Sequence, residues 1–285
     1  MHIGHKTLLP TIFFLCFWLI FPWVYGIIIS FYNYVLVRPG LISFAGLSNY
    51  IHLFASRDFQ EALIQTFIYV IIILAIELLL GLGSALLLSK DFRGAGLLRV
   101  LCGLPILFIP MGSAILWKNM FMPGVGLADL FTQQLGLGVL DWWGSHLYSS
   151  LLIIMIDVWQ WTPFVTIILV AALMSLPRDP FEAAKVDGLP ATMVFTKITF
   201  PMITPVMIIV GILRTLDLIK LMEPVMIVSR GGVGTATLSF YVWKAVFKSM
   251  DIGLGGAVST IYWSMAWILA NILLKVFTKS LEGRR

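Results

Sequence analysis

A few charged and amide side chains interrupt otherwise apolar stretches of this chain, and these polar groups are its candidates for chemistry. The stretch 202–228 contains Arg214 and Asp217, and the stretch 149–175 contains Asp157 followed closely by Gln160. Charged groups are costly in apolar surroundings, so they usually face a cavity or one another. These residues could therefore bind a polar solute or form a structural ion pair.

The segment before Pro163 combines aromatic rings with an amide. It reads Asp157-Val158-Trp159-Gln160-Trp161-Thr162-Pro163, and the proline leaves one helix carbonyl without its usual donor. Carbohydrates suit such a mixture, because their C–H faces pack on aromatic rings and their hydroxyls need paired donors and acceptors. We expect Gln160 and Trp161 to be the firmer solute contacts. Trp159 or Trp161 could instead serve helix packing or the membrane interface.

The second group of polar residues lies around Arg214. On a helix, Arg214, Asp217, Leu218 and Leu221 stand at offsets 0, 3, 4 and 7 and would form one face. That face could line a solute path. Alternatively, Arg214 and Asp217 form an i, i+3 ion pair that neutralises itself and only holds helices together. We interpret Glu77, in another apolar stretch, as a packing or cavity-lining residue with no assigned role.

The sequence does not support the common enzymatic chemistries. Cys16 and Cys102 fall in apolar stretches at different depths, which argues against a disulfide or a Cys-x-x-Cys site. None of the four histidines lies in such a stretch, and the HExxH motif is absent. The glycine-rich segment 230–235 lacks the Lys-Ser/Thr ending of a phosphate-binding loop. We therefore predict no catalytic residue, no metal site and no cofactor bound by this chain.

The composition indicates which elements position these residues. Of 285 residues, 60% are hydrophobic and 12% are charged, with a mean hydropathy of +0.98. About 20 apolar residues in a helix cross a bilayer core, and hydrocarbon cannot satisfy open backbone groups. We predict an all-α, polytopic membrane protein with six transmembrane helices. The predicted spans are 8–31, 62–88, 99–122, 149–175, 202–228 and 257–277.

The distribution of basic residues predicts the orientation. If both termini are cytoplasmic, 11 of the 19 Lys and Arg residues lie in inside segments, six lie outside and two lie within the fifth span. The positive-inside rule therefore favours N-in and C-in. The net charge of +5 is explained by this topology, and it forms no nucleic-acid patch.

A polar segment, EAAKVDGLPATMVFTKITFP, runs from Glu182 to Pro201 between the fourth and fifth spans. We predict a short helix over 181–186, a backbone reversal at Gly188 that caps it, and a second helix with Pro190 in its first turn. An amphipathic helix lying on the membrane is the alternative. The Gly and Pro spacing favours a rigid helix–turn–helix that projects into the cytoplasm.

The spacing of this segment resembles the EAA loop of ABC importer permeases. The match comprises Glu182-Ala183-Ala184, three residues, Gly188, nine residues, and Ile198-Thr199-Phe200-Pro201, with Phe200 where the family usually has leucine. The segments 44–50, 159–164 and 231–232 resemble the carbohydrate, maltose and glycerol-phosphate type of this family. The resemblance covers nearly the whole chain.

The resemblance implies a type I ABC importer permease fold, with residues 1–285 as a single permease domain and 176–201 as its cytoplasmic coupling loop. Glu182, Ala183, Ala184, Asp187 and Gly188 would contact a separate ATPase, which binds ATP and Mg. The family's sugar site implies a substrate path along the fifth span and the segment before Pro163. The chain itself would be no enzyme.

The resemblance also implies the partners and the location. The partners would be a second homologous permease, two ATPase subunits, a periplasmic or lipid-anchored solute-binding protein and the lipid bilayer. The complex would lie in the bacterial inner membrane. The cargo could be a sugar, a polyol, a glycoside or a glycerol phosphate.

A stand-alone ion-coupled carrier is the rival interpretation. It would use Asp157, Asp217 and Glu77 as a proton relay and would show paired internal repeats. The sequence contains no convincing repeat.

The outer segments and the third span yield two further expectations. We expect 32–61, 123–148 and 229–256 to form the receptor surface, with Trp142, Trp143 and Trp243 at the membrane interface. Pro105 and Pro110 predict a kink in the third span.

Overall fold

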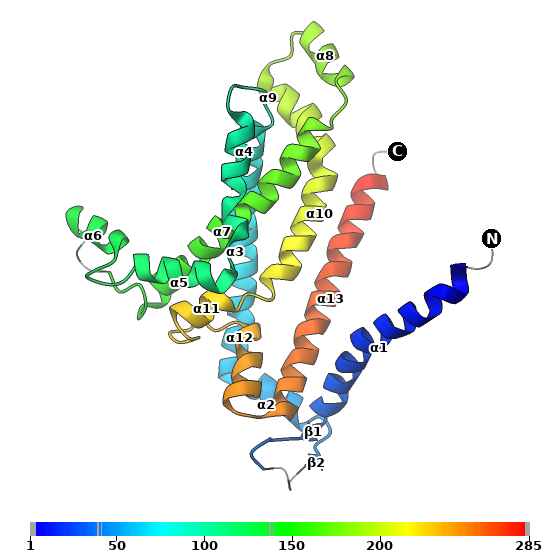
Figure 1. The fold of residues 1–285 in the computed structure, drawn as a ribbon, viewed down its shortest axis with the longest axis vertical. Helices are drawn as coiled ribbons and strands as arrows, with labels where there is room; N and C mark the ends of the chain where they lie inside the picture. Colours follow the sequence, from blue (N-terminus) through cyan, green and yellow to red (C-terminus); the bar gives the residue numbers. More distant parts are fainter. Residues whose placement is uncertain (1–3, 39, 41, 137, 139, 283–285) are drawn as a thin grey trace. The chain divides into compact units, whose positions relative to one another are not determined.

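The computed structural model describes residues 4–38, 40, 42–136, 138 and 140–282. The described chain is mainly helical and includes one small antiparallel sheet, in which Tyr32 pairs with Phe44 (Figure 1). The elements in chain order are α1 (Gly4–Ser30), β1 (Tyr32–Asn33), β2 (Ser43–Phe44), α2 (Ser48–Ala55), α3 (Arg57–Leu88), α4 (Ala95–Gly103), η2 (Leu104–Leu107), α5 (Pro110–Met120), α6 (Leu127–Gln134), α7 (His146–Met174), α8 (Asp179–Val186), α9 (Ala191–Val194), η3 (Phe195–Thr199), α10 (Phe200–Leu218), α11 (Glu223–Val228), α12 (Leu238–Trp243), η4 (Lys244–Lys248) and α13 (Ile252–Glu282).

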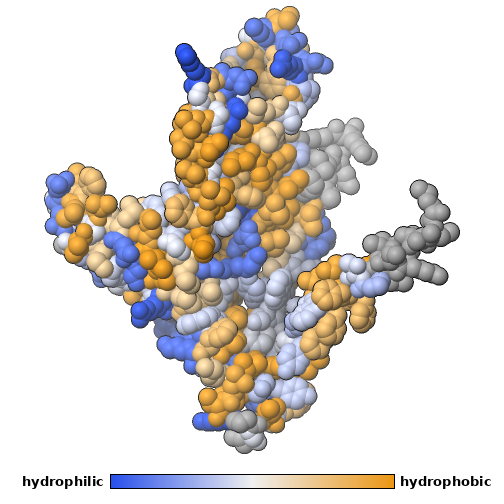
Figure 2. Space-filling model, in the orientation of Figure 1, coloured by the Kyte–Doolittle hydropathy of each residue, from blue (hydrophilic) through white to orange (hydrophobic). Residues whose placement is uncertain are grey.

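The chain is a multi-pass membrane protein, as its composition predicts. Among the described residues, five helices are long and apolar enough to cross a membrane, and the number becomes six if one bent pair counts as a span. Figure 2 shows apolar side chains over much of the visible surface, with hydrophilic ones around α8 and in smaller patches elsewhere. Apolar surface on this scale requires lipid or protein cover.

The bent pair is the predicted third span. Ala95–Leu107 and Pro110–Met120 meet at an angle of 94°. The break lies where Pro110 begins α5, because proline disfavours helical geometry in the residue before it, and Ile109 is extended there. The predicted kink is confirmed, and it is sharp enough to divide the predicted span 99–122 into separate helices.

The predicted fifth span is also interrupted. α10 ends at Leu218, where Lys220 N–H bonds to Asp217 O at 2.9 Å and Leu221 N–H bonds to Leu218 O at 3.0 Å. Such i to i+3 bonds tighten the last turn of a helix. α11 begins only at Glu223. Leu221 therefore lies beyond α10, and the predicted four-residue helical face does not form as such.

The chain divides into two compact units. Unit 1 comprises Met1–Leu63 with Leu238–Trp267, and unit 2 comprises Ile64–Thr237 with Ile268–Arg285. In unit 1, Asn49 donates its amide hydrogens to Ser30 O at 2.8 Å and to Tyr32 O at 3.0 Å. A helix leaves its last carbonyls without partners, so this side chain closes the end of α1.

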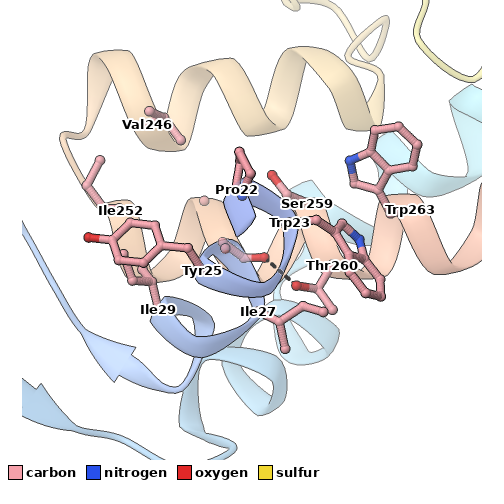
Figure 3. A pocket seen from close by; sticks show the side chains of 13 residues that line it. Pro22, Trp23, Tyr25, Ile27, Ile29, Val246, Ile252, Ser259, Thr260 and Trp263 are labelled. Carbon is pink, nitrogen blue, oxygen red and sulfur yellow. Dashed lines mark hydrogen bonds between the residues drawn. The ribbon is translucent and has the colours of Figure 1, made fainter. Parts of the chain in front are cut away.

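Small residues let α1 and α13 pack closely within unit 1. A Cβ added at Gly256 would lie 2.9 Å from the carbonyl oxygen of Gly26. Beside this contact is a cavity of about 240 Å³, whose wall includes Tyr25 and Trp263 (Figure 3). Thr260 donates its hydroxyl to Gly256 O at 2.8 Å. The wall is thus mainly apolar, with this hydroxyl already bonded to its own helix.

The core of unit 2 lies between α3, α7 and α10. Its buried residues include Ala85, Val165, Leu169 and Val210. Gly81 of α3 faces this core, and a Cβ there would lie 2.6 Å from Cγ1 of Val165. Small residues at such contacts let membrane helices approach closely.

A single added methyl group therefore tests the α3–α7 contact. We expect Gly81→Ala to lower the melting temperature of the purified protein, because overpacking costs roughly 1–3 kcal/mol. Gly83→Ala is the matched control on the same helix, since a Cβ there meets no atom within 4 Å. Alanine favours helix over glycine, so this control should match or exceed the wild type. Equal melting temperatures for the two variants would contradict the close contact.

Candidate functional site

The polar hairpin forms as predicted. α8 ends in a Schellman motif, in which Leu189 N–H bonds to Ala184 O at 3.0 Å and Gly188 N–H bonds to Lys185 O at 3.2 Å. Gly188 has φ +69°, a conformation that suits glycine. Pro190 is the N-cap of α9, one position earlier than predicted. The tight turn holds α8 at one end of unit 2 (Figure 1).

The predicted contact residues do not all face outward. Glu182, Ala183, Asp187 and Gly188 are exposed, whereas Ala184 is only 2% exposed and packs into the chain itself. Of the two alanines, only Ala183 is therefore open to a partner. Sequence reasoning missed Val186, which is 87% exposed. An apolar residue four positions after Glu182 in a polar segment was the available signal.

The second arm of the hairpin continues into a membrane helix. α9, the π-helical turn η3 and α10 follow one another without an irregular residue from Ala191 to Leu218. Phe200 N–H bonds to Phe195 O, five residues earlier, so the backbone stays hydrogen-bonded through the wider turn before Pro201. A displacement of the hairpin can therefore pass directly to α10.

A buried ion cluster joins α10 to α3 and α7. Arg214 binds Glu77 with both ends of its guanidinium, Nε to Oε2 at 2.8 Å and Nη2 to Oε1 at 2.7 Å. Nη2 also donates to Oδ2 of Asp157 at 2.6 Å. All three side chains are buried. Bidentate, charge-assisted bonds of this kind are strong and fix the geometry of three helices.

The main partners of Arg214 in this cluster differ from the predicted one, Asp217. Nη1 of Arg214 lies 3.9 Å from Oδ2 of Asp217, a longer contact than those to Glu77 and Asp157. The Asp217 side chain is 47% exposed and also contacts Lys220 at 3.2 Å. Asp217 is thus a secondary partner. Glu77, to which the sequence assigned no role, is the main one, because a lone carboxylate buried in an apolar helix needs a cation.

The residues of the aromatic segment before Pro163 have different surroundings and different roles. The ring of Trp161 lies 5.0 Å from the guanidinium carbon of Arg214, a cation–π contact. Gln160 is buried and donates to Phe108 O at 2.8 Å. Trp159 packs on Phe108 and Trp117, with ring centroids 5.8 Å apart in each pair. Trp159 therefore serves packing here, and Trp161 borders the ion cluster.

The remaining predicted path residues are buried within the chain. Leu218 is 1% exposed and Leu221 is 5% exposed. In the described part of the chain, no three His, Cys, Asp or Glu side chains are placed to hold a metal ion. The chemistry available around Arg214 is therefore ion pairing, hydrogen bonding and aromatic stacking.

The segment between α5 and α7, which the sequence predicts outside the membrane, is fixed by a carboxylate. Asp129 accepts the backbone N–H groups of Gly124 at 2.6 Å and of Leu140 at 3.2 Å. The hydrogen bond from Gly124 is the main reason why the pKa of Asp129 is lowered. Trp142, expected at the membrane interface, is instead buried against Phe121, with ring centroids 4.6 Å apart. Aromatic packing holds this tryptophan inside the loop.

Comparisons with known proteins cover nearly the whole chain. It is similar to the trehalose/maltose transport system permease protein MalF of Thermococcus litoralis, with 30% identity over 275 residues that cover 96% of this chain and 93% of the relative. Its fold is similar to a crystal structure of a bacterial ABC transporter involved in the import of the acidic polysaccharide alginate, with TM-score 0.86, 19% identity and coverage of 97% and 95%. A structure of the bacterial alginate transporter in complex with an alginate pentasaccharide-bound periplasmic protein matches with TM-score 0.83, 19% identity and coverage of 95% and 92%. No family model matches the chain.

Proposed function

This chain belongs to the ABC importer permeases of the carbohydrate uptake family, and we propose that it forms part of the path by which a neutral sugar, polyol or glycoside crosses the membrane. Its fold is that of a type I ABC importer permease. The chain is a transport subunit without catalytic activity, and the ATP of such an importer is bound by a separate ATPase.

The observation that carries this proposal is the α8–α9 hairpin and its continuous connection to α10. Glu182, Ala183, Asp187 and Gly188 offer the exposed surface for the ATPase, and Ala184 supports it from within. When ATP draws the two ATPase subunits together, the docked hairpin moves α10. Since Arg214 ties α10 to α3 and α7, these helices move together and expose the path alternately on each side.

The rest of the proposed assembly is the one that the family resemblance implies. The complex comprises a second homologous permease, two ATPase subunits and a periplasmic or lipid-anchored solute-binding protein. The periplasmic protein in the alginate transporter complex supports the last of these. Residues 1–285 act as one permease domain in the bacterial inner membrane, with both termini cytoplasmic, as the distribution of Lys and Arg favours.

The ion cluster supports a neutral cargo. Three N–H donors of Arg214 already bind Glu77 and Asp157, and the indole of Trp161 covers the guanidinium. The carboxylates of Glu77 and Asp157 already balance the charge of Arg214, so an anionic cargo would be repelled by them as it approached. Trp161 and the half-exposed Asp217 are the path residues open to a sugar. Gln160 joins them when its bond to Phe108 O opens, and Trp159, Leu218 and Leu221 shape the wall behind them.

Uptake by the reconstituted complex tests this function. Liposomes containing this chain with its partner permease, ATPase and binding protein should accumulate labelled trehalose or maltose only when ATP is present. The chain alone should show no uptake driven by an ion gradient. Gradient-driven uptake by the purified chain alone would instead establish a stand-alone carrier.

The same assay examines the cargo contacts. We expect Trp161→Ala and Gln160→Ala to raise the apparent KM by about tenfold, because each lost contact is worth on the order of 1 kcal/mol or more. Trp159→Phe is the control, since it keeps an aromatic ring on Phe108. Wild-type rate and affinity in both alanine variants, at normal protein levels, would place the cargo elsewhere along the path.

A further inference from the structure

The short helix between α1 and α3 has two distinct faces. Leu47, the N-cap of α2, stands with Ile51 and Phe54 at offsets 0, 4 and 7, so the three share one side of the helix. They are 62%, 66% and 55% exposed. We propose that these three residues, the α2 apolar face, rest in the interfacial layer of the lipid bilayer.

The opposite face of α2 is bound to the end of α1. Asn49 and Leu53 are buried, and Asn49 donates to the carbonyls of Ser30 and Tyr32. Ser30 Oγ and the Tyr50 hydroxyl share a further bond of 2.6 Å. These bonds fix the rotation of α2 about its axis. The apolar face therefore stays turned away from α1, and of its three residues Phe54 also packs on Phe59 of α3, with ring centroids 5.6 Å apart.

The segments before and after α2 determine how deep it lies relative to the hydrocarbon of the bilayer. The apolar run of α1 ends at Ser30, and α3 begins at Arg57, directly after α2. The first turn of α3 carries an exposed ion pair, Arg57 to Glu61 at 2.8 Å, and its apolar run starts only at Ala62. Arg57 and Ala62 are separated by about 7 Å of helix rise. α2 is thus tethered at both ends to the boundary where spans leave the hydrocarbon.

Lipid fits this face better than a soluble partner does. The face contains no charged residue, and amphipathic helices at a membrane boundary bury such a face among headgroups and acyl chains. The surfaces of transient protein complexes are about as polar as the rest of a protein. Segment 32–61 was expected to be receptor surface, whereas its α2 apolar face is assigned here to the membrane. This membrane contact goes beyond the proposed transport function and does not depend on the cargo.

Site-directed spin labelling tests the proposal in the complete complex. Cys16 and Cys102 are the only cysteines, so a variant with both changed to serine accepts one label at a chosen position. Labels at Leu47→Cys, Ile51→Cys and Phe54→Cys should collide more often with oxygen than with a water-soluble nickel chelate in liposomes. His52→Cys is the matched control, because this exposed polar position lies beside the face. Its label should collide more often with the nickel chelate than with oxygen.

Other outcomes would overturn the proposal. A label at Ile51 as accessible to the nickel chelate as the label at His52 would place the face in water. Exclusion of both reagents at Ile51 in the complete complex would place it against another permease helix. If adding the sugar-loaded binding protein changes how often the label at Ile51 collides with either reagent, the face would belong to the contact with that protein. ATP-driven uptake by each labelled complex verifies that the variants are folded.

Discussion

Replacement of Arg214 by methionine is expected to destabilise the permease by about 3–5 kcal/mol, because it leaves two buried carboxylates without their cation. The carboxylates are those of Glu77 and Asp157, which bind the guanidinium at 2.6–2.8 Å. The measurement is the melting temperature of the purified chain in detergent, together with its recovery as a monodisperse species.

Compensating substitutions identify the true partners of Arg214. Arg214→Met combined with Glu77→Leu and Asp157→Leu should regain most of the lost stability, because a whole buried ion cluster can often be replaced by apolar residues. Arg214→Met with Asp217→Leu is the matched control. It should stay unstable, because Asp217 is the more distant and half-exposed partner. Rescue by this pair alone would contradict the observed cluster.

The stable triple variant also separates packing from cargo binding. If the cluster is structural, the triple variant should still carry a neutral sugar in the reconstituted complex. A well-folded triple variant that assembles with its partners and carries nothing would show that transport needs the cluster itself, either as a cargo contact or as the link by which α10 moves α3 and α7.

Gly188→Val is expected to weaken the contact through which the permease and its ATPase act on each other. A β-branched residue is strained at φ +69°, at a cost of about 1–3 kcal/mol. Valine should therefore open the turn that holds α8. We expect uptake and cargo-stimulated ATP hydrolysis to fall by about tenfold or more, with Glu182→Ala giving a similar but smaller loss. Membrane insertion should be unchanged, because the hairpin lies outside the spans.

Gly136→Val is the control for backbone strain. Gly136 also has a positive φ, +75°, with no atom near an added Cβ, and lies between α6 and α7 rather than in the hairpin. The Gly136→Val variant should keep ATP-coupled uptake. Normal stimulation in both hairpin variants would remove 182–188 as the ATPase contact.

The sequence by itself determined the features that depend on neighbouring residues. Apolar length predicted the membrane helices, and Pro110 predicted the break in the third span. Gly188 predicted the turn after α8, because a Schellman motif is closed by bonds between residues only a few positions apart. The family resemblance likewise came from short segments, above all 182–201, supported by 44–50, 159–164 and 231–232.

Only the tertiary structure decided which residues meet across the fold. Arg214 and Asp217 looked like partners because they are three residues apart, yet Arg214 binds Glu77, which is 137 positions away. Gln160 bonds to a carbonyl exposed by the break at Phe108, 52 positions away. Helix periodicity also placed Leu221 on a face that ends at Leu218. Propensity and spacing act within one helix, whereas a buried charge takes whichever partner packing brings closest, so its pairing depends on how separate helices are arranged.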